Sequence, residues 1–216
     1  ASSYLNNKKP VVLGADEMKI FFKNMMTLLA CLMFLVCSGC GIKAESDKNK
    51  VAYSVTDVTG TVIEFSEKPK RIVSMGIGSD EILLELVEPE RIAALTYLAD
   101  DAGISSVSVK AQVIKGRVQR NNLEAILSYA PDLVVVPDWD GIDFVGQLRS
   151  AGIKVYVHKT PNTMQEIKAN IAELAAAVGE DEQGYLLQQQ MDERLSAIWS
   201  KVGKIKPEQR KKIVAL

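Results

Sequence analysis

Two aromatic residues, Tyr97 and Trp139, each lie at or just past the end of a short apolar run that we expect to be a β-strand. Rings at such points can stack on a flat conjugated ligand, or they can pack beneath the loops as edge core. Arg117 and Arg120 lie together in the segment KGRVQR. Their guanidinium groups could bind carboxylates or phenolates of a ligand, or they could be solvated loop charges. These four residues are candidates for ligand binding.

The turn Gly76-Ile-Gly78 follows another apolar run. A dinucleotide-binding loop would have its third glycine at position 81, but Glu81 stands there. Its carboxylate would crowd the strand and repel a pyrophosphate. Open α/β sheets bind ligands at the carboxyl ends of their strands, where such turns lie. We therefore interpret Gly76 as part of a cleft-lining turn and as a fifth candidate ligand-binding residue.

The sequence offers little for catalysis or metal binding. It has one histidine, His158, and its three cysteines all lie within the first 40 residues. The later part therefore offers neither a Ser/His/Asp nor a Cys/His catalytic set, and it cannot form a metal cage of several histidines. Asp80 and Glu81 are better explained by the dipole of a helix capped by Ser79 than by acid–base catalysis. We predict no catalytic residue, no metal ligand and no cofactor. His158 and Lys159 end a predicted strand and could also reach the cleft.

The composition is that of a globular protein with balanced charge. The 216 residues include 26 Lys and Arg and 27 Asp and Glu, which gives a net charge of −1, and 47% of the residues are hydrophobic. A net charge so close to zero gives no electrostatic case for a nucleic-acid partner. The chain is long enough for one substantial α/β domain.

Short apolar runs alternate with amphipathic stretches from residue 71 onward. The clearest run, Leu133-Val-Val-Val-Pro137, is continuous and β-branched, which is typical of a strand in a parallel sheet. This alternation predicts an α/β fold with a mostly parallel sheet flanked by helices. Two β-rich runs around Thr59-Gly60 predict an N-terminal hairpin. Further strands are expected over residues 71–75, 92–97, 110–114 and 153–157. Helices are expected from Ser79, from Asn121, and around Phe144, Val145 and Leu148. The helix from Asn121 should have Leu123, Ile126 and Leu127 facing inward.

Two longer helices are expected after residue 160. Thr163-Met-Gln-Glu166 is a capping box, and the helix that it opens is stopped by Gly179. A second helix begins near Asp181, and about 20 residues of it would make a rod of about 30 Å. Its inward stripe is expected to be Leu187, Met191, Leu195, Ile198 and Val202. Residues 213–216 look like the opening of another buried strand, so we expect the protein to continue beyond them.

The stretch from Met18 to Cys40 has the pattern of an export signal. Lys19 and Lys23 precede a charge-free apolar run that is too short for a spanning helix, which needs about 20 residues. The ending Cys37-Ser-Gly-Cys40 resembles the lipobox of bacterial lipoproteins, in which the last cysteine is lipidated and becomes the first mature residue. Cys37 departs from that pattern, where Leu or Val is usual. The alternatives are an ordinary secretory signal and an uncleaved anchor.

Several segments together resemble the class III solute-binding lipoproteins of ABC importers, which bind iron–siderophores, haem or vitamin B12. The resemblance depends on the order and spacing of the segments and extends from about residue 50 to the end. The segments are KPKRIVS at 68–74, SDEILL at 79–84, NLEAIL at 122–127, APDLV at 130–134 and GIKVY at 152–156, followed by the paired helices.

This resemblance implies two lobes that close on one ligand, joined by a long helix. Residues 1–17 contain no Met and precede the only plausible start, so we interpret them as an upstream non-native segment or untranslated-region remnant, followed by the predicted lipoprotein signal peptide (18–39) and a polar tether (40–50). The resemblance divides the rest into an N-terminal α/β ligand-binding lobe (51–160), a helical segment with the long inter-lobe helix (161–204) and the start of a C-terminal lobe that is otherwise missing (205–216). It also implies aromatic ligand contacts near Tyr97 and Trp139. Glu124 would dock on permease arginines, although its spacing also suits a cap at the helix start.

The implied function is capture of a metal chelate and its delivery to an ABC permease and ATPase. Iron–siderophore or haem is the first expectation for the chelate, and cobalamin the next. The protein would be an extracytoplasmic monomer, anchored to the bacterial membrane by a lipid on Cys40, without enzyme activity. The alternatives are an extracytoplasmic α/β enzyme or chelatase that uses the same cleft, and a surface adhesion or structural lipoprotein.

Overall fold

The computed structural model describes residues 19, 23, 51–120, 122–209 and 211, and the fold lies in the part from residue 51 onward. Its centre is a five-stranded sheet in the order β5-β4-β3-β6-β7, in which every neighbouring pair is parallel. The predicted α/β fold with a mostly parallel sheet is therefore confirmed. The strands are β3 (Ile72–Ser74), β4 (Ile92–Thr96), β5 (Gly116–Val118), β6 (Leu133–Pro137) and β7 (Val155–His158).

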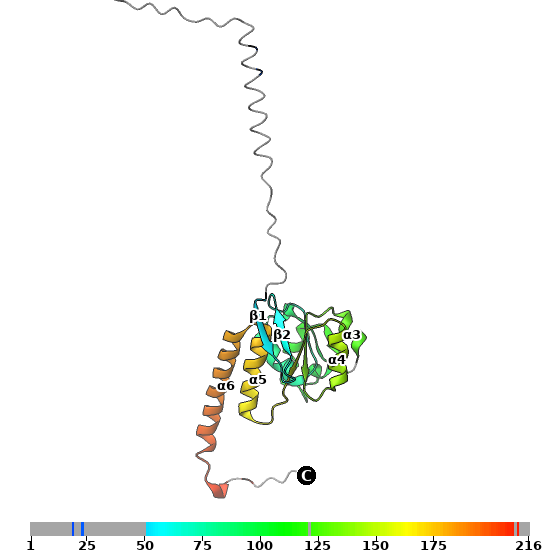
Figure 1. Cartoon of the computed structure of the whole chain (residues 1–216). Helices are drawn as coiled ribbons and strands as arrows, with labels where there is room; N and C mark the ends of the chain where they lie inside the picture. Colours follow the sequence, from blue (N-terminus) through cyan, green and yellow to red (C-terminus); the bar gives the residue numbers. More distant parts are fainter. Residues whose placement is uncertain (1–18, 20–22, 24–50, 121, 210, 212–216) are drawn as a thin grey trace, which may run out of the picture. The chain divides into compact units, whose positions relative to one another are not determined.

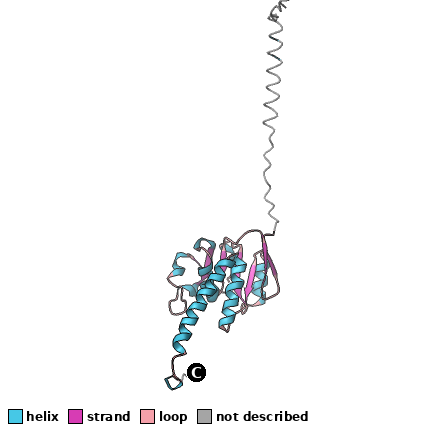
Figure 2. Ribbon diagram, turned by 90° about the vertical axis from the view of Figure 1, so that its left-hand side faces the viewer, coloured by secondary structure: helices cyan, strands magenta, loops and turns pink. Residues whose placement is uncertain are grey.

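Successive side chains of the sheet enter two different hydrophobic cores. Leu133 and Val135 of β6 belong to the core on the side of α2 (Ile77–Leu86) and α5 (Met164–Val178). Val134 and Val136 belong to the core on the side of α3 (Leu123–Ser128) and α4 (Ile142–Ser150). Every residue of β6 is buried, which explains its continuous apolar sequence. Figure 1 shows the sheet between these two layers of helices, and Figure 2 views the molecule from the side of α5 and α6.

The predicted N-terminal hairpin is present, and Asp57 connects it to the main fold. Strands β1 (Tyr53–Thr56) and β2 (Val62–Phe65) pair antiparallel. The Asp57 side chain is fully buried, and its Oδ1 accepts a hydrogen bond from the Thr59 amide at 2.9 Å. Its Oδ2 forms an ion pair with Arg149 of α4 at 2.5 Å. A buried carboxylate must be paired in this way to offset its loss of hydration.

The two long helices begin where the sequence predicts. Thr163 caps α5, because its Oγ1 accepts a hydrogen bond from the Glu166 amide at 3.2 Å, while Oε2 of Glu166 accepts from the Asn162 amide at 2.7 Å and not from Thr163. Gly179 ends the helix with a φ of 75°. Next comes α6 (Asp181–Val202), which packs against α5 at Gly184. A Cβ on Gly184 would lie 2.4 Å from the Cβ of Ala175, so only glycine permits this close approach.

The predicted inward stripe of α6 is wrong for its second half. Leu187 packs against the core, but the side chains of Ile198 and Val202 are 54% and 38% exposed. The reason is length: α6 has 22 residues whereas α5 has 15, so the last turns of α6 run past the end of its neighbour (Figure 1). A helical hydrophobic pattern indicates which face is apolar, and it does not indicate what covers that face.

The strand predicted over residues 110–114 is absent and a short 3₁₀ helix, η3 (Lys110–Val113), takes its place. Ala111 and Ile114 are both buried because a 3₁₀ helix brings residues three apart onto one side, while Val113 is 59% exposed. The edge strand beside β4 is β5 instead. Its Gly116 lies so close to β4 that an added Cβ would be 2.1 Å from the Ala93 carbonyl oxygen.

Two predicted helix starts are corrected by the structure. Gly76, and not Ser79, is the N-cap of α2, and the Ser79 hydroxyl donates to the Gly76 carbonyl at 2.8 Å from within the first turn. The cap of α3 is Asn122, whose side chain accepts from the Ala125 amide at 3.0 Å. The expected inward position of Leu127 on α3 is also wrong, because this side chain is 39% exposed.

Several predictions concern residues outside the described part of the chain. These are the lipidation of Cys40, the tether and the strand expected at 213–216; only two residues of the predicted signal peptide, Lys19 and Lys23, are described. Within the described residues, no helix combines the length and the apolarity that crossing a membrane requires.

Candidate ligand-binding site

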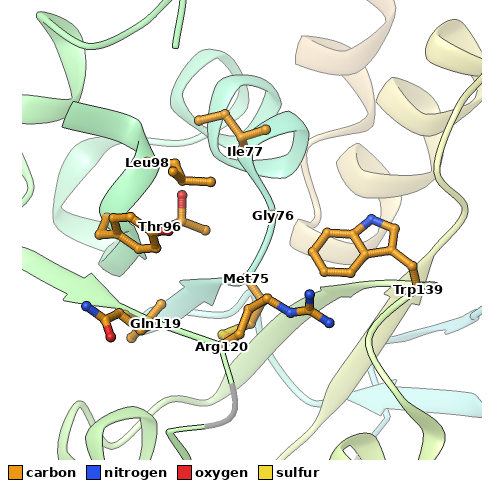
Figure 3. Close-up of a pocket in the computed structure, with 10 residues that line it drawn as sticks. Met75, Gly76, Ile77, Thr96, Leu98, Gln119, Arg120 and Trp139 are labelled. Carbon is orange, nitrogen blue, oxygen red and sulfur yellow. The ribbon is translucent and has the colours of Figure 1, made fainter. Parts of the chain in front are cut away.

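A pocket of about 450 Å³ lies at the carboxyl ends of the parallel strands (Figure 3). Four segments line it: residues 75–77 after β3, 96–98 at the end of β4, 118–120 at the end of β5, and Trp139 after β6. Its volume falls within the range of about 300–1,000 Å³ that is typical of small-molecule sites.

The order of the strands explains why the pocket forms here. From β3 the chain continues into α2 on one face of the sheet, and from the neighbouring β6 it continues into α4 on the other face. Because the two connections leave in opposite directions, a crevice opens outside the carboxyl ends of these strands, and open α/β sheets bind their ligands in such a crevice. The topology of the fold therefore creates the pocket.

The floor of the pocket is supported by a buried carboxylate. Thr96, which lines the pocket, donates hydrogen bonds from its amide and its hydroxyl to Asp80 of α2; the amide lies 3.2 Å from Oδ2. Asp80 is fully buried, and this burial raises its pKa to about 7, although the bonds from Thr96 act in the opposite direction. Asp80 thereby ties the first turn of α2 to the end of β4.

One wall of the pocket is an arginine stacked on a tryptophan. The guanidinium carbon of Arg120 lies 4.3 Å from the centroid of the Trp139 ring, a distance typical of a cation–π contact. The Nε of Arg120 donates to Oδ1 of Asp140 at 2.8 Å. Figure 3 shows the Arg120 side chain extending toward the indole of Trp139. The wall therefore combines a flat ring with a positive charge.

Four of the five predicted ligand-binding residues line this one pocket. Gly76, Tyr97, Arg120 and Trp139 are all among its lining residues, although 42 positions separate Tyr97 from Trp139 in the sequence. Tyr97 and Trp139 are 53% and 49% exposed, so their rings are open to a bound molecule. Their role in binding a ligand remains a prediction.

The fifth residue, Arg117, does not line this pocket, and its contact with a ligand stays a prediction. Its Nε and Nη2 pair with the carboxylate of Asp100 at 2.8 and 2.5 Å. Its Nη1 donates to the carbonyls of Ile114 and Gly116, both at 2.8 Å, and this arrangement secures the loop before β5. All three guanidinium nitrogens are therefore occupied by the protein itself.

Three further residues of interest also lie away from the pocket. Glu124 is exposed in the first turn of α3. His158 is buried, which lowers its pKa, and its ring lies beside Asn170. Lys159 forms an ion pair with Glu166 at 2.6 Å. The expectation that His158 and Lys159 reach the cleft is therefore wrong for this pocket.

Sequence reasoning missed the buried acids that support the pocket. Asp80 had been assigned to the helix dipole, but the hydrophobic residues around it in SDEILL place it on the buried side of α2. Asp140 directly follows Trp139, and no local pattern marks it as buried. Its partner Arg120 is 20 residues away in the sequence, so only the tertiary fold reveals the pair.

The chemistry of the pocket suits binding. Its lining is mostly apolar, with Thr96, Tyr97, Gln119 and Arg120 supplying polar groups at the rim and floor. In the described part of the chain, no cluster of three or more His, Cys, Asp or Glu side chains is placed to hold a metal ion. Such a surface can stack a flat molecule and pair with its negative charge.

Comparison with known proteins also indicates a binding protein. The pattern of a family described as periplasmic binding protein matches residues 71–216, which is more than half of the chain. The chain belongs to the periplasmic binding protein family. The resemblance to the class III solute-binding proteins is thereby confirmed.

Two curated relatives of this periplasmic binding protein are informative. The cobalamin-binding protein of Halobacterium salinarum is 24% identical over 157 residues, which cover 72% of this chain and 42% of the relative. The uncharacterized ABC transporter substrate-binding lipoprotein YvrC of Bacillus subtilis is 24% identical over 196 residues, which cover 86% of this chain and 60% of the relative. The chain thus spans about half the length of these relatives.

Solved structures show the same fold. The heme binding protein HmuT superposes with a TM-score of 0.60 at 21% identity, covering 76% of this chain and 53% of that one. The periplasmic vitamin B12 binding protein BtuF of Vibrio cholerae superposes with a TM-score of 0.51 at 22% identity, covering 65% and 53%. At these identities the superpositions establish the architecture of this lobe.

The substitution Asp80→Asn is expected to flatten the pH dependence of stability. The pKa of Asp80 is about 7 in the folded chain, against an ordinary value of 3.8, so the folded state retains a proton that the unfolded state releases. The resulting stability is complete below about pH 4 and is lost as the pH rises through about 7, by on the order of a few kcal/mol. Urea unfolding followed by circular dichroism between about pH 4 and 8 measures this decline.

The control for this measurement is Asp143→Asn, at an exposed position in the first turn of α4. The control should keep the decline with pH, while Asp80→Asn should lose it. An equal decline in Asp80→Asn and the parent would contradict a protonated Asp80 in the floor of the pocket.

Proposed function

We propose that this protein is the substrate-binding component of an ABC importer, and that it captures a metal chelate and delivers it to the permease. An iron–siderophore or haem is the leading candidate cargo, and a cobalamin is the next. The observation that carries the proposal is the pocket at the topological switch point, whose wall is Trp139 stacked with Arg120. The mechanism is binding and hand-over, without bond chemistry.

The chemistry of the pocket supports a large, flat and negatively charged cargo. Tyr97 and Trp139 offer two exposed rings on different segments, and Arg120 offers a cation beside one of them. Porphyrins, corrins and catecholate chelates combine conjugated surface with acidic groups, which aromatic rings and guanidinium groups recognise. The names of two similar proteins, a cobalamin-binding protein and a heme binding protein, support the same class of cargo.

The complete site is proposed to need a second wall. The pocket lies at one end of a single sheet, and a small-molecule site usually buries most of its ligand. We infer that a further lobe of the protein closes over the pocket and that the chain described here alone would bind weakly. Export, a lipid anchor on Cys40 and a monomeric state complete the proposal, and the similar protein YvrC is named a lipoprotein.

Binding of a chelate is expected to quench the fluorescence of Trp139. Trp199→Phe leaves Trp139 as the sole tryptophan of the 216 residues. Titration of the full-length gene product, with any tryptophan outside these residues also replaced by Phe, with haemin, a ferric catecholate and cyanocobalamin should give saturable quenching with at least one. The matched control, Trp139→Phe with Trp199 retained, corrects for light absorption by the chelate and should show no saturable quenching. Flat titrations with all three compounds would contradict the proposed function.

Glu124 is proposed to dock on the permease. It is exposed in the first turn of α3 and does not line the pocket, so its carboxylate is free to meet arginines of another protein. Glu124→Ala should leave chelate affinity unchanged and weaken association with the cognate permease several-fold, measured by uptake and by co-purification. The control Glu193→Ala, exposed on α6, should change neither. Normal uptake by Glu124→Ala would remove the docking role.

A further inference from the structure

Asp140 is an unusual residue for the edge of a binding pocket. Its side chain is 1% exposed, although it directly follows Trp139, which is 49% exposed. One carboxylate oxygen, Oδ1, accepts the hydrogen bond from Arg120. The other, Oδ2, is buried and has no hydrogen-bond partner among the described residues. A buried charge with a single partner depends strongly on that partner.

The bond to Asp140 leaves most of the Arg120 guanidinium unused. Only its Nε takes part in a hydrogen bond within the described part of the chain, and the side chain is 53% exposed. In Arg117, by contrast, all three guanidinium nitrogens are bound by the protein. The terminal nitrogens of Arg120 are therefore available at the rim of the pocket, with the guanidinium held against one face of the Trp139 ring.

We propose that Asp140 is a positioning residue that holds Arg120 against Trp139, so that the terminal nitrogens of Arg120 bind an acidic group of the cargo. Because Arg120 covers one face of the indole, a molecule that reaches that face of Trp139 meets the guanidinium first. The site would thus select a flat molecule that carries a carboxylate, phosphate or phenolate at its edge. The choice of an acidic cargo rests on the proposed function, whereas the positioning role of Asp140 does not.

The physical reason for using Asp140 is its burial. An exposed carboxylate would hold Arg120 loosely, because water competes for both charges. At Asp140 little water is present, and burial raises its pKa while the neighbouring Arg120 opposes that rise. Moving Arg120 away would leave an uncompensated buried charge, so the arginine is kept in one orientation. A group fixed before binding loses less conformational freedom when the ligand arrives.

The positioning role can be tested on the chain without any ligand. In the Trp199→Phe background, Trp139 is the only tryptophan and reports directly on the stacked guanidinium. Arg120→Met should change its emission maximum and lifetime, and Asp140→Asn should reproduce that change. The double variant should match Arg120→Met, because both substitutions remove the same contact. Asp138→Asn is the matched control: it lies in the same loop but accepts from Thr160 and should leave the emission unchanged.

Clear outcomes would overturn the positioning role. It is wrong if Asp140→Asn keeps the parent emission, or if the double variant shows the sum of two separate effects. Circular dichroism checks that each variant is folded. If Asp140→Asn does not fold, Arg120→Met decides the matter, since an unchanged Trp139 emission in that variant would show that Arg120 is not held on the ring.

The acidic group of the cargo is tested with haemin and its dimethyl ester, which have the same ring and differ in their carboxylates. On the full-length gene product, Arg120→Met and Asp140→Asn should each weaken haemin binding by about tenfold and leave binding of the ester within about twofold of the parent. Equal losses for haemin and its ester would overturn the recognition of an acidic group. If the parent binds neither compound, haem is excluded as the cargo, while the emission measurements still decide the role of Asp140.

Discussion

The structure depends on a parallel sheet that must be covered on both faces. Every residue of β3, β6 and β7 is buried, so helices have to pack above and below them. The chain satisfies this requirement by sending α2 and α5 to one face and α3 and α4 to the other. Where neighbouring strands send their helices in opposite directions, nothing fills the space beyond the strand ends. The candidate ligand pocket is the consequence of that constraint.

Two buried carboxylates stabilise the pocket from outside its lining. Asp80 holds Thr96 in the floor, and Asp140 holds Arg120 in the wall. Burying such groups costs free energy unless they are hydrogen-bonded or paired, so each one fixes the residue that it contacts. The exposed rings of Tyr97 and Trp139 line the same pocket as Thr96 and Arg120. Under the proposed function, this arrangement provides a pre-formed surface for a flat cargo.

The sequence was informative wherever a local pattern determines the structure. The continuous apolar run of β6, the hairpin turn and the Thr163 cap of α5 were predicted correctly because each depends on neighbouring residues. The positions of Tyr97 and Trp139 in the pocket followed from strand ends meeting at one edge of a sheet. Local pattern could not identify β5, whose Gly116 is required by the backbone of β4, nor the partners of Arg117 and Asp140, which only the tertiary fold brings together.

Hydrogen exchange of the full-length gene product, with and without haemin or cyanocobalamin, tests the central claim most directly, because it reports where a ligand binds without substituting any residue. We expect slower amide exchange in residues 75–77, 96–98, 118–120 and 139, at the carboxyl ends of the strands, and unchanged exchange in residues 90 and 91, before β4 at the opposite end of the sheet. Protection confined to the opposite end, or elsewhere on the protein, would contradict the account.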